Sequence, residues 1–499
     1  MRWIVPGVLV VVAALLRLYR LDAESLWLDE AFSVVTGRAS VETLLRQTSE
    51  DFHPPLYFIL LHAWMAMTDG SGWSARPLSV VFSVATVGAA SWAGRTLADR
   101  TTGLVAGVLL AISVFQIEFA QEARMYALVA CLATVSTVAL VRMAQEHAAS
   151  PEAPSGASPW PPIVSRWWWA YATTSTLLLY THAYSVFVFI AHAIAVARAW
   201  RVDVRGRRLA ERWFTAMLVP AAAFLAWLPI FAQQFWVVQR GFWIPAPAWT
   251  DAASPIRTYA GSDALTWILA PLAALGFVRL IRQPRPGGSI IAPAWLVAAW
   301  LLMPIVLPLV LSFVSAPVFL PKYTIAASVA FALAAAAGIA WLPRLLRGVV
   351  LIVILAFAGQ ALQAFYQAPR KDNWRQTVGD VAAMARPGDA MVFYPYFTEI
   401  PWSLYWTRTD VRIAPFAKHA EAVTGPTLRA MFDGLIGTSP RVWLVLMEYD
   451  ARRPTLLDHL GARYRTVTRH RHGHIDVYVA DGPRPPGPDM TLAIPVDNR

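Results

Sequence analysis

Two adjacent carboxylates, Asp29 and Glu30, occur in the motif W-L-D-E-A-F-S, shortly after the first apolar run of the chain. Charged side chains so close to an apolar segment are costly unless they are used or paired. A carboxylate that is partly shielded from water can take a proton from a hydroxyl group, as general-base catalysis requires. Alternatively, the pair caps a helix in a loop, because acidic side chains are common at helix starts. The motif alone leaves both interpretations open.

Two further motifs combine basic and aromatic residues. D-F-H-P-P-L-Y-F places His53 before two prolines that fix the backbone, with Tyr57 one turn into the segment that follows. A rigid His suits a phosphate, but it can equally be a residue at a helix start with no ligand. Q-E-A-R-M-Y-A-L supplies Glu122, Arg124 and Tyr126; the first and last are four residues apart and share a helix face. Arg124 either holds a phosphate or pairs with a carboxylate.

The motifs P-K-Y-T and Y-T-H-A-Y add three candidates. Lys322 and Tyr323 precede a long apolar run, and Lys322 can reach a lipid phosphate by extending its side chain to the membrane surface. His182 lies in a tight turn between two apolar runs, where a purely structural turn residue is the alternative. None of these motifs identifies a function singly.

The elements that must position these residues are membrane-spanning helices. The chain is 57% hydrophobic and only 15% charged, which indicates that the bilayer is its main solvent. We predict about eleven spans, and treat residues 1–365 as one bundle with a long first loop over residues 20–72. Within this loop, residues 54–67 are apolar but short, which favours an interfacial helix. The apolar runs are centred near residues 11, 86, 110, 132, 175, 190, 222, 270, 300, 332 and 354.

The arginines set the orientation of the bundle. A net charge of +11 would suggest nucleic acid in a soluble protein, but here the arginines occupy short loops, so we expect no nucleic-acid partner. Five of these loops fall on one side, which the positive-inside rule makes cytoplasmic. The segments that carry the candidate residues then lie on the outer side. The five loops contain Arg95 and Arg100, Arg142 and Arg166, the cluster from Arg198 to Arg212, Arg282 and Arg285, and Arg344 and Arg347.

The composition becomes mixed and polar near Tyr366, which predicts a small outer α/β domain over residues 366–499. Candidate strands are residues 390–394, 411–414, 442–446 and 475–479, preceded by a helix over 374–385. We interpret residues 145–165 as a flexible cytoplasmic linker and the Pro-rich end as an extended tail. The single cysteine, Cys131, gives neither a disulfide nor a metal site.

The convergence of these residues is the argument for function. Carboxylates and cations from several loops lie on one side, above apolar helices. An anionic, lipid-borne substrate fits this layout: the bilayer delivers its tail, the carboxylates face its reactive head, and the cations neutralise a departing phosphate. The arrangement requires neither a metal nor a cofactor.

Four motifs together, W-L-D-E-A-F-S, H-P-P-L-Y-F, S-A-R-P-L-S-V and Q-E-A-R-M-Y-A-L, resemble the lipid-dependent glycosyltransferases of family 39. These include protein O-mannosyltransferases and the aminoarabinose transferase of lipid A. The resemblance implies the GT-C fold and inverting transfer of a hexose or pentose from a polyprenyl phosphate to an outer acceptor. It also implies an integral protein of a bacterial-type plasma membrane.

The resemblance assigns roles residue by residue. Asp29 matches the catalytic base, Glu30 supports it, and Glu122 matches the acidic position of the second loop. His53 stands where the aminoarabinose transferases have a cationic phosphate-binding residue, and Lys322 stands where many relatives have Arg. A His can be neutral and Lys lacks the bidentate fork of Arg, so both positions depart from the family pattern.

Two other classes of function remain open. A lipid-linked sugar flippase or another transporter would also have many helices and cationic loops, although transporters usually carry their polar groups at the membrane midplane. A non-catalytic scaffold would leave the shared placement of the four loops unexplained. The acceptor is a protein, a lipid or a polysaccharide of the cell envelope.

Overall fold

The structure is a computed structural model that describes residues 4–149, 165–202, 204–240, 243–284, 286–417, 423, 425–447 and 450–484. By its internal contacts the chain divides into two units. Unit 1 comprises residues 1–21 and 36–368, and unit 2 comprises residues 22–35 and 369–499. The segment 22–35, which carries Asp29 and Glu30, therefore groups with the C-terminal domain.

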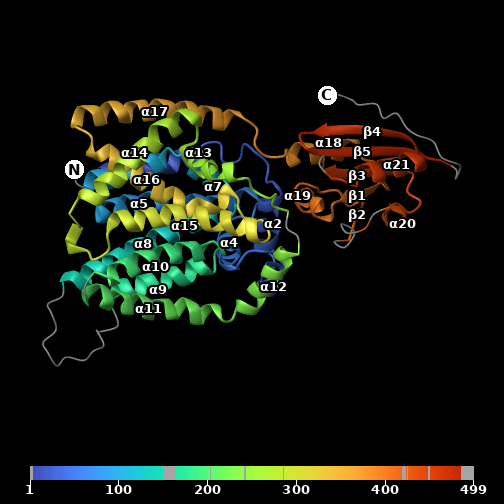
Figure 1. The fold of residues 1–499 in the computed structure, drawn as a ribbon. Helices are drawn as coiled ribbons and strands as arrows, with labels where there is room; N and C mark the ends of the chain where they lie inside the picture. The colour runs from blue at the N-terminus through green and yellow to red at the C-terminus, as the bar shows by residue number, and fades with distance from the viewer. Residues whose placement is uncertain are drawn as a thin grey trace. The chain divides into compact units, whose positions relative to one another are not determined.

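Unit 1 is helical, and each of the eleven predicted apolar runs is a helix (Figure 1). Its α-helices are α1 (Ile4–Leu18), α3 (Val41–Glu50), α4 (Leu56–Met67), α5 (Arg76–Leu97), α6 (Arg100–Ala111), α7 (Val114–Ala120), α8 (Tyr126–Ala149), α9 (Arg166–Leu179), α10 (Ser185–Trp200), α11 (Val204–Phe224), α12 (Leu228–Gln239), α13 (Ser254–Ala260), α14 (Asp263–Arg282), α15 (Pro293–Val314), α16 (Ile325–Trp341) and α17 (Arg344–Gln367). The helix α2 (Leu28–Arg38) begins in unit 2.

The number of spans is smaller by length and composition than the predicted eleven. Six helices in the described ranges are long and apolar enough to cross a membrane, or eight if each of two bent pairs is one span. These pairs are α6 with α7, bent by 60°, and α11 with α12, bent by 78°. Helices α1, α9 and α10 have 15, 14 and 16 residues, which gives lengths of about 21–24 Å against a hydrocarbon core of about 30 Å. The count of eleven is therefore not confirmed.

Close helix packing forms the centre of unit 1. Almost every side chain of α16 is buried, and the helix contains a run of alanines. A Cβ atom on Gly276 of α14 would lie 1.8 Å from the carbonyl oxygen of Ala334, and one on Gly338 would lie 1.9 Å from that of Leu272. Two glycines that face each other thus let the backbones of α14 and α16 approach closely, as small residues do in membrane bundles.

The bend between α6 and α7 is held by a fully buried arginine. The Arg17 guanidinium donates to the carbonyl oxygens of Leu110 and Ala111 at 3.0 and 3.1 Å, and to Ser83 Oγ at 2.7 Å. Gln121 in turn donates its amide to the carbonyl of Arg17 at 3.0 Å. Carbonyls that the helix break leaves without intrahelical donors are satisfied in this way, and the segment that leads to Glu122 is fixed.

Unit 2 contains a five-stranded sheet in the order β2-β1-β3-β5-β4. The strands are β1 (Ala390–Tyr394), β2 (Arg412–Pro415), β3 (Arg441–Met447), β4 (Tyr464–His472) and β5 (Ile475–Pro483). β1 is parallel to β2 and β3, whereas β5 is antiparallel to β3 and β4. Helices α18 (Trp374–Met384), α19 (Glu399–Ser403), α20 (Gly425–Ile436) and α21 (Arg453–Arg463) complete the domain, with an apolar cluster on each face of the sheet.

The α/β prediction for this domain is confirmed, with one strand missed. Four predicted strands match β1, β2, β3 and β5: the bounds of the first three agree to within one residue, whereas β5 extends four residues beyond the predicted end at residue 479. The edge strand β4 was not predicted because its sequence, Y-R-T-V-T-R-H-R-H, has few apolar residues. Residues 145–149 of the predicted linker belong to α8. Most of the rest of that linker, and most of the predicted tail, lie outside the described residues.

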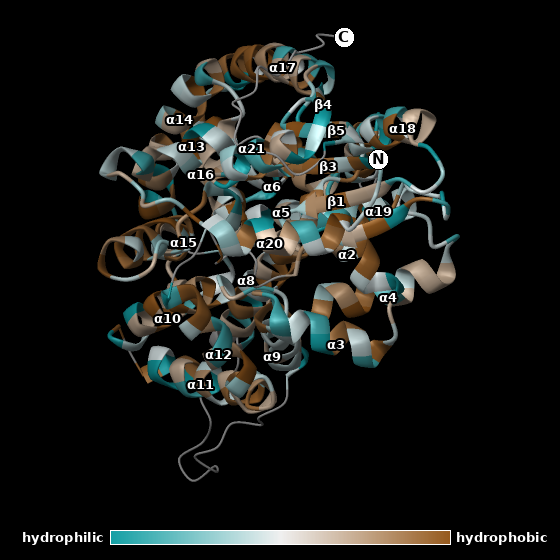
Figure 2. Cartoon of the chain, turned by 90° about the vertical axis from the view of Figure 1, so that its right-hand side faces the viewer, coloured by the Kyte–Doolittle hydropathy of each residue, from teal (hydrophilic) through white to brown (hydrophobic). Residues whose placement is uncertain are grey.

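The two short helices α3 and α4 differ in hydropathy. In Figure 2, α3 carries both hydrophilic and hydrophobic stretches, whereas α4 is largely hydrophobic. The N-cap Ser40 accepts a hydrogen bond from the backbone of Thr43 and so fixes the start of α3. Pro54 and Pro55 separate the two helices, and the prediction of a short helix over residues 54–67 is confirmed by α4.

Candidate functional site

Six predicted residues of unit 1 gather in one place: His53, Arg124, Tyr126, His182, Lys322 and Tyr323, here called the basic aromatic cluster. His182 lies at its centre. The ring centroid of His182 is 5.4 Å from that of His53, 6.1 Å from that of Tyr126 and 5.2 Å from that of Tyr323. Loops distant in sequence therefore converge as predicted.

His182 is buried and presents a hydrogen-bond donor to the cluster. It lies in the turn between α9 and α10, and its Nδ1 accepts the backbone N–H of Tyr184 at 3.1 Å. The neutral ring then carries its proton on Nε2. This nitrogen is buried and has no hydrogen-bond partner among the described residues. Burial, together with the charges of His53, Arg124 and Lys322, holds the pKa of His182 well below its usual range.

His53 is paired with a carboxylate that the sequence analysis did not single out. Its Nδ1 lies 3.0 Å from Asp51 Oδ2 in a partly buried pair. Burial raises the pKa of Asp51, but the charge and hydrogen bond of His53 and the charge of Arg124 outweigh this, and the net pKa is lowered. Asp51 thus places a carboxylate directly beside the His53 ring.

Lys322 lies among aromatic rings. Its Nζ is 5.8 Å from the ring centroid of Tyr126, 5.6 Å from that of Tyr323 and 5.6 Å from that of Trp243. These distances are within the range of cation–π interactions, so the rings restrict the ammonium group. The short helix η4 (Pro321–Thr324), which leads into α16, positions this side chain.

Two other predicted residues, Tyr57 and Glu122, are connected by hydrogen bonds to the backbone of Arg124. Tyr57 is fully buried, and its hydroxyl lies 2.9 Å from Ser79 Oγ, which donates to the carbonyl of Arg124 at 3.1 Å. Tyr57 thus positions the backbone of Arg124. Glu122 is also buried, and its carbonyl accepts the N–H of Arg124 at 2.8 Å. The segments that contain His53 and His182 are joined by a hydrogen bond from the N–H of Leu56, the first residue of α4, to the carbonyl of Tyr180, just after α9, at 3.1 Å.

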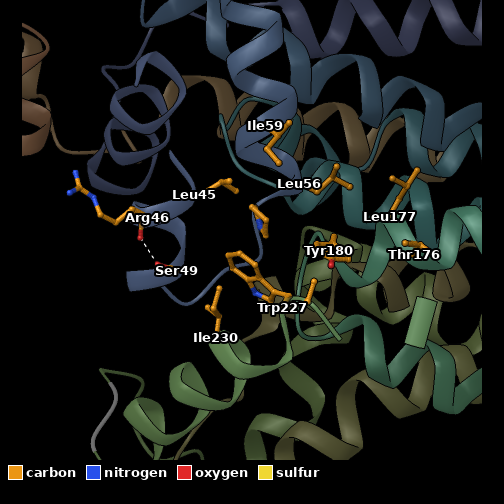
Figure 3. A pocket seen from close by; sticks show the side chains of 12 residues that line it. Leu45, Arg46, Ser49, Leu56, Ile59, Thr176, Leu177, Tyr180, Trp227 and Ile230 are labelled. Carbon is orange, nitrogen blue, oxygen red and sulfur yellow. Dashed lines mark hydrogen bonds between the residues drawn. The ribbon is translucent and has the colours of Figure 1, made fainter. Parts of the chain in front are cut away.

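An apolar groove of about 660 Å³ is lined in part by Leu56 and Tyr180, the two residues that this hydrogen bond joins. Figure 3 shows Leu45, Ile59, Leu177 and Trp227 around it, while the guanidinium of Arg46 points away. Pro55 and Tyr180 also line the groove, and each is two residues from a histidine of the cluster. The groove and the cluster therefore share two segments of unit 1, the one around His53 and the one around His182.

Asp29 and Glu30 lie in unit 2, in the first turn of α2. Asp29 is half-buried, whereas Glu30 is completely buried and its Oε2 accepts a hydrogen bond from Lys371 Nζ at 2.8 Å. The two neighbouring carboxylates thus differ in environment.

The sequence analysis missed three residues that contact the candidate residues: Asp51, Trp243 and Lys371. Only Asp51 gave a signal in the sequence, because it begins the motif D-F-H-P-P.

The buried His182 makes the stability of the protein dependent on pH. Because its folded-state pKa is lowered, the unfolded chain binds a proton that the folded chain does not. Stability should therefore decrease as the pH falls below about 6.5. In thermal unfolding of the solubilised protein, His182→Gln should lose less melting temperature than wild type between about pH 7.5 and pH 5. Equal losses would contradict this account. The pKa of Asp51 is lowered by His53 and Arg124, so this carboxylate does not titrate in the same range.

Comparison with solved structures places the whole chain beside known membrane proteins. The apo crystal structure of ArnT from Cupriavidus metallidurans matches with a TM-score of 0.64 at 12% identity, over 95% of this chain and 97% of that one. The undecaprenyl phosphate-bound structure matches with a TM-score of 0.61 over the same shares, also at 12% identity. The apo oligosaccharyltransferase of Archaeoglobus fulgidus matches with a TM-score of 0.57 at 10% identity, over 89% and 69%. No protein-family profile and no curated protein sequence matches the chain.

Proposed function

The chain has the GT-C fold of membrane glycosyltransferases, and on this premise we propose that it transfers a sugar from a polyprenyl phosphate to an acceptor on the outer side of the membrane. The observation that carries the proposal is the buried Nε2–H of His182 beside Lys322, Arg124 and His53. A phosphate oxygen is the acceptor that such a group of donors and cations would bind best. ArnT has been solved with undecaprenyl phosphate, and the Archaeoglobus enzyme with a dolichol-phosphate and an inhibitory peptide.

In the proposed reaction, Asp29 takes the proton of an acceptor hydroxyl as the oxygen attacks C1 of the sugar. The C1–O bond to the lipid phosphate breaks, its electron pair stays on the phosphate, and the anomeric configuration inverts. The basic aromatic cluster stabilises the phosphate dianion that is released. Hydrogen-bond donors placed where negative charge develops lower the activation barrier of the transfer. No atom changes its oxidation state in this step.

The apolar groove is the proposed site of the isoprenoid chain next to the phosphate. Inside a bilayer, hydrophobicity gives no preference for a groove over lipid, so the fit of the chain must come from packing. Ile59→Trp should obstruct the groove at a cost of about 1–3 kcal/mol. This corresponds to an increase of about five- to 150-fold in KM for long-chain donors.

The chain length of the donor provides the control for this prediction. A donor with one or two isoprene units does not extend through the groove, so its KM should change little in Ile59→Trp. The smaller variant Ile59→Val should behave as wild type with both donors. If Ile59→Trp raised the KM of short and long donors equally, the isoprenoid chain would not occupy this groove.

The function is tested by incubating the purified protein in lipid nanodiscs with a panel of radiolabelled polyprenyl-phosphate sugars and an extract of envelope acceptors. Nucleotide sugars serve as the negative controls. We expect label to pass to acceptor from at least one lipid donor and from no nucleotide sugar. The absence of transfer from every lipid donor, in a folded preparation that binds polyprenyl phosphate, would count against an enzyme.

A further inference from the structure

The segment that leads into α2 is held by the residues that open the C-terminal part of unit 2. Ser25 Oγ donates to the carbonyl of Asp372 at 2.6 Å and accepts the N–H of Trp374 at 3.1 Å. Glu24 accepts the backbone N–H of Arg370 at 2.6 Å and its guanidinium at 2.7 Å. A short stretch of backbone thus aligns with residues 370–374 through main-chain and charged hydrogen bonds.

The deepest contact of this segment is the ion pair between Glu30 and Lys371. The Glu30 side chain is 0% exposed and that of Lys371 is 7% exposed, with 2.8 Å between Oε2 and Nζ. The pair belongs entirely to unit 2 although 341 residues separate its members. Removing one member of such a buried pair is strongly destabilising, because the charge that remains in the interior loses a counter-charge.

The geometry of α2 connects this pair to Asp29. Successive residues of an α-helix are rotated by about 100°, so Asp29 and Glu30 point in different directions from the first turn. Glu30 points to Lys371 and fixes the rotation of α2 about its axis, while Asp29 stays half-buried. Ser33 Oγ further donates to the carbonyl of Asp29 at 3.0 Å. The direction of the Asp29 side chain therefore depends on the neighbouring ion pair.

We propose that Lys371 is a positioning residue, which through Glu30 holds the helix that presents Asp29 to the acceptor hydroxyl. This inference rests on the proposed function, and it gives the start of the C-terminal domain a part in catalysis. Glu30 then acts as an anchor of α2, whereas the proton is taken by Asp29 alone. Tyr405, whose hydroxyl accepts the N–H of Leu26 at 2.8 Å, adds a second attachment from the same domain.

The test compares four variants of the full chain: Lys371→Met, Lys371→Arg, the charge exchange Glu30→Lys with Lys371→Glu, and Arg375→Gln. The last removes the exposed pair between Arg375 and Asp22, whose side chains are 47% and 55% exposed, and is the matched control. Exposed pairs contribute little to stability. Sugar transfer is measured for kcat and for the KM of the donor, together with the melting temperature of each protein.

We expect Lys371→Met to lower kcat by about 100-fold, the effect of a misplacement of about 1 Å, with the donor KM within about twofold of wild type. Lys371→Arg and the charge exchange should recover most of the loss, and Arg375→Gln should match wild type. A purely structural ion pair would instead lower the amount of active enzyme and the melting temperature together.

If Lys371→Met destabilises the protein too strongly, the double variant Glu30→Gln with Lys371→Met removes both charges and keeps the site neutral. The inference predicts that this folded variant still has a low kcat. A wild-type kcat in either variant would overturn the role of Lys371 and leave the glycosyltransferase proposal intact. An inactive wild type would instead refute the proposed function.

Discussion

Asp29→Asn should strongly lower the rate of sugar transfer while leaving donor binding unchanged. The amide keeps the size of the side chain but cannot take the proton of the acceptor hydroxyl. General-base catalysis contributes about 10²–10⁴-fold, so kcat should fall by that factor, with the KM of the polyprenyl-phosphate sugar within about twofold of wild type. The first turn of α2 tolerates a neutral amide at a cost of about 0.3–1 kcal/mol, so the variant should fold.

Asp22→Asn is the matched control, because Asp22 lies in the same segment, is exposed and forms a surface pair with Arg375. Its kcat should equal that of wild type. Transfer is followed by the appearance of labelled acceptor at saturating donor. If Asp29→Asn retained wild-type kcat, another group would be the base, and the half-buried position of Asp29 would have only a structural role.

Lys322→Met should weaken the binding of polyprenyl phosphate. The ammonium group is oriented by the rings of Tyr126, Tyr323 and Trp243, so little side-chain freedom remains to be lost on binding. A hydrogen bond to a charged group contributes about 1.5–3 kcal/mol, which predicts an increase in Kd of about ten- to 150-fold. Binding is measured by calorimetry with a short-chain polyprenyl phosphate in detergent.

Two variants distinguish a phosphate contact from a general loss of positive charge. Lys322→Arg keeps the charge and should bind within about fivefold of wild type, with the difference set by the geometry of the guanidinium. Arg257→Met removes an exposed arginine that pairs with Asp263 and should have no effect. A Kd that rises equally in Lys322→Met and Arg257→Met would show that the effect is not local to the cluster.

The fold followed closely from hydrophobic patterning. All eleven apolar runs are helices because about 20 apolar residues have few alternatives in a bilayer. Helix length was harder to predict from the sequence. The runs that form α1, α9 and α10 are apolar enough for membrane spans, yet these helices end after 14–16 residues. The bend after Ala111 is held by Arg17, which lies far away in the sequence, and no local pattern predicts that partner.

The sequence indicated which residue types and which loops form the candidate site. It did not indicate which side chains form ion pairs with one another. His53, His182 and Lys322 lie close together although they come from loops that are distant in the sequence. The adjacent Asp29 and Glu30 look equivalent in sequence, but Glu30 is buried against Lys371, far along the chain. Asp51 precedes His53 by two residues and was overlooked because proline and histidine dominated the motif. Long-range partners of this kind are set by packing, which a single sequence does not encode locally.

The central claim is tested most directly by measuring two products of one reaction in proteoliposomes: labelled sugar on the acceptor and polyprenyl phosphate released. For a glycosyltransferase the two amounts are equal over time in wild type, and the rates of both fall about 10²–10⁴-fold in Asp29→Asn. If instead labelled lipid crossed the bilayer intact, with no sugar on the acceptor and no difference between wild type and Asp29→Asn, the protein would be a lipid-linked sugar flippase and the account would be wrong.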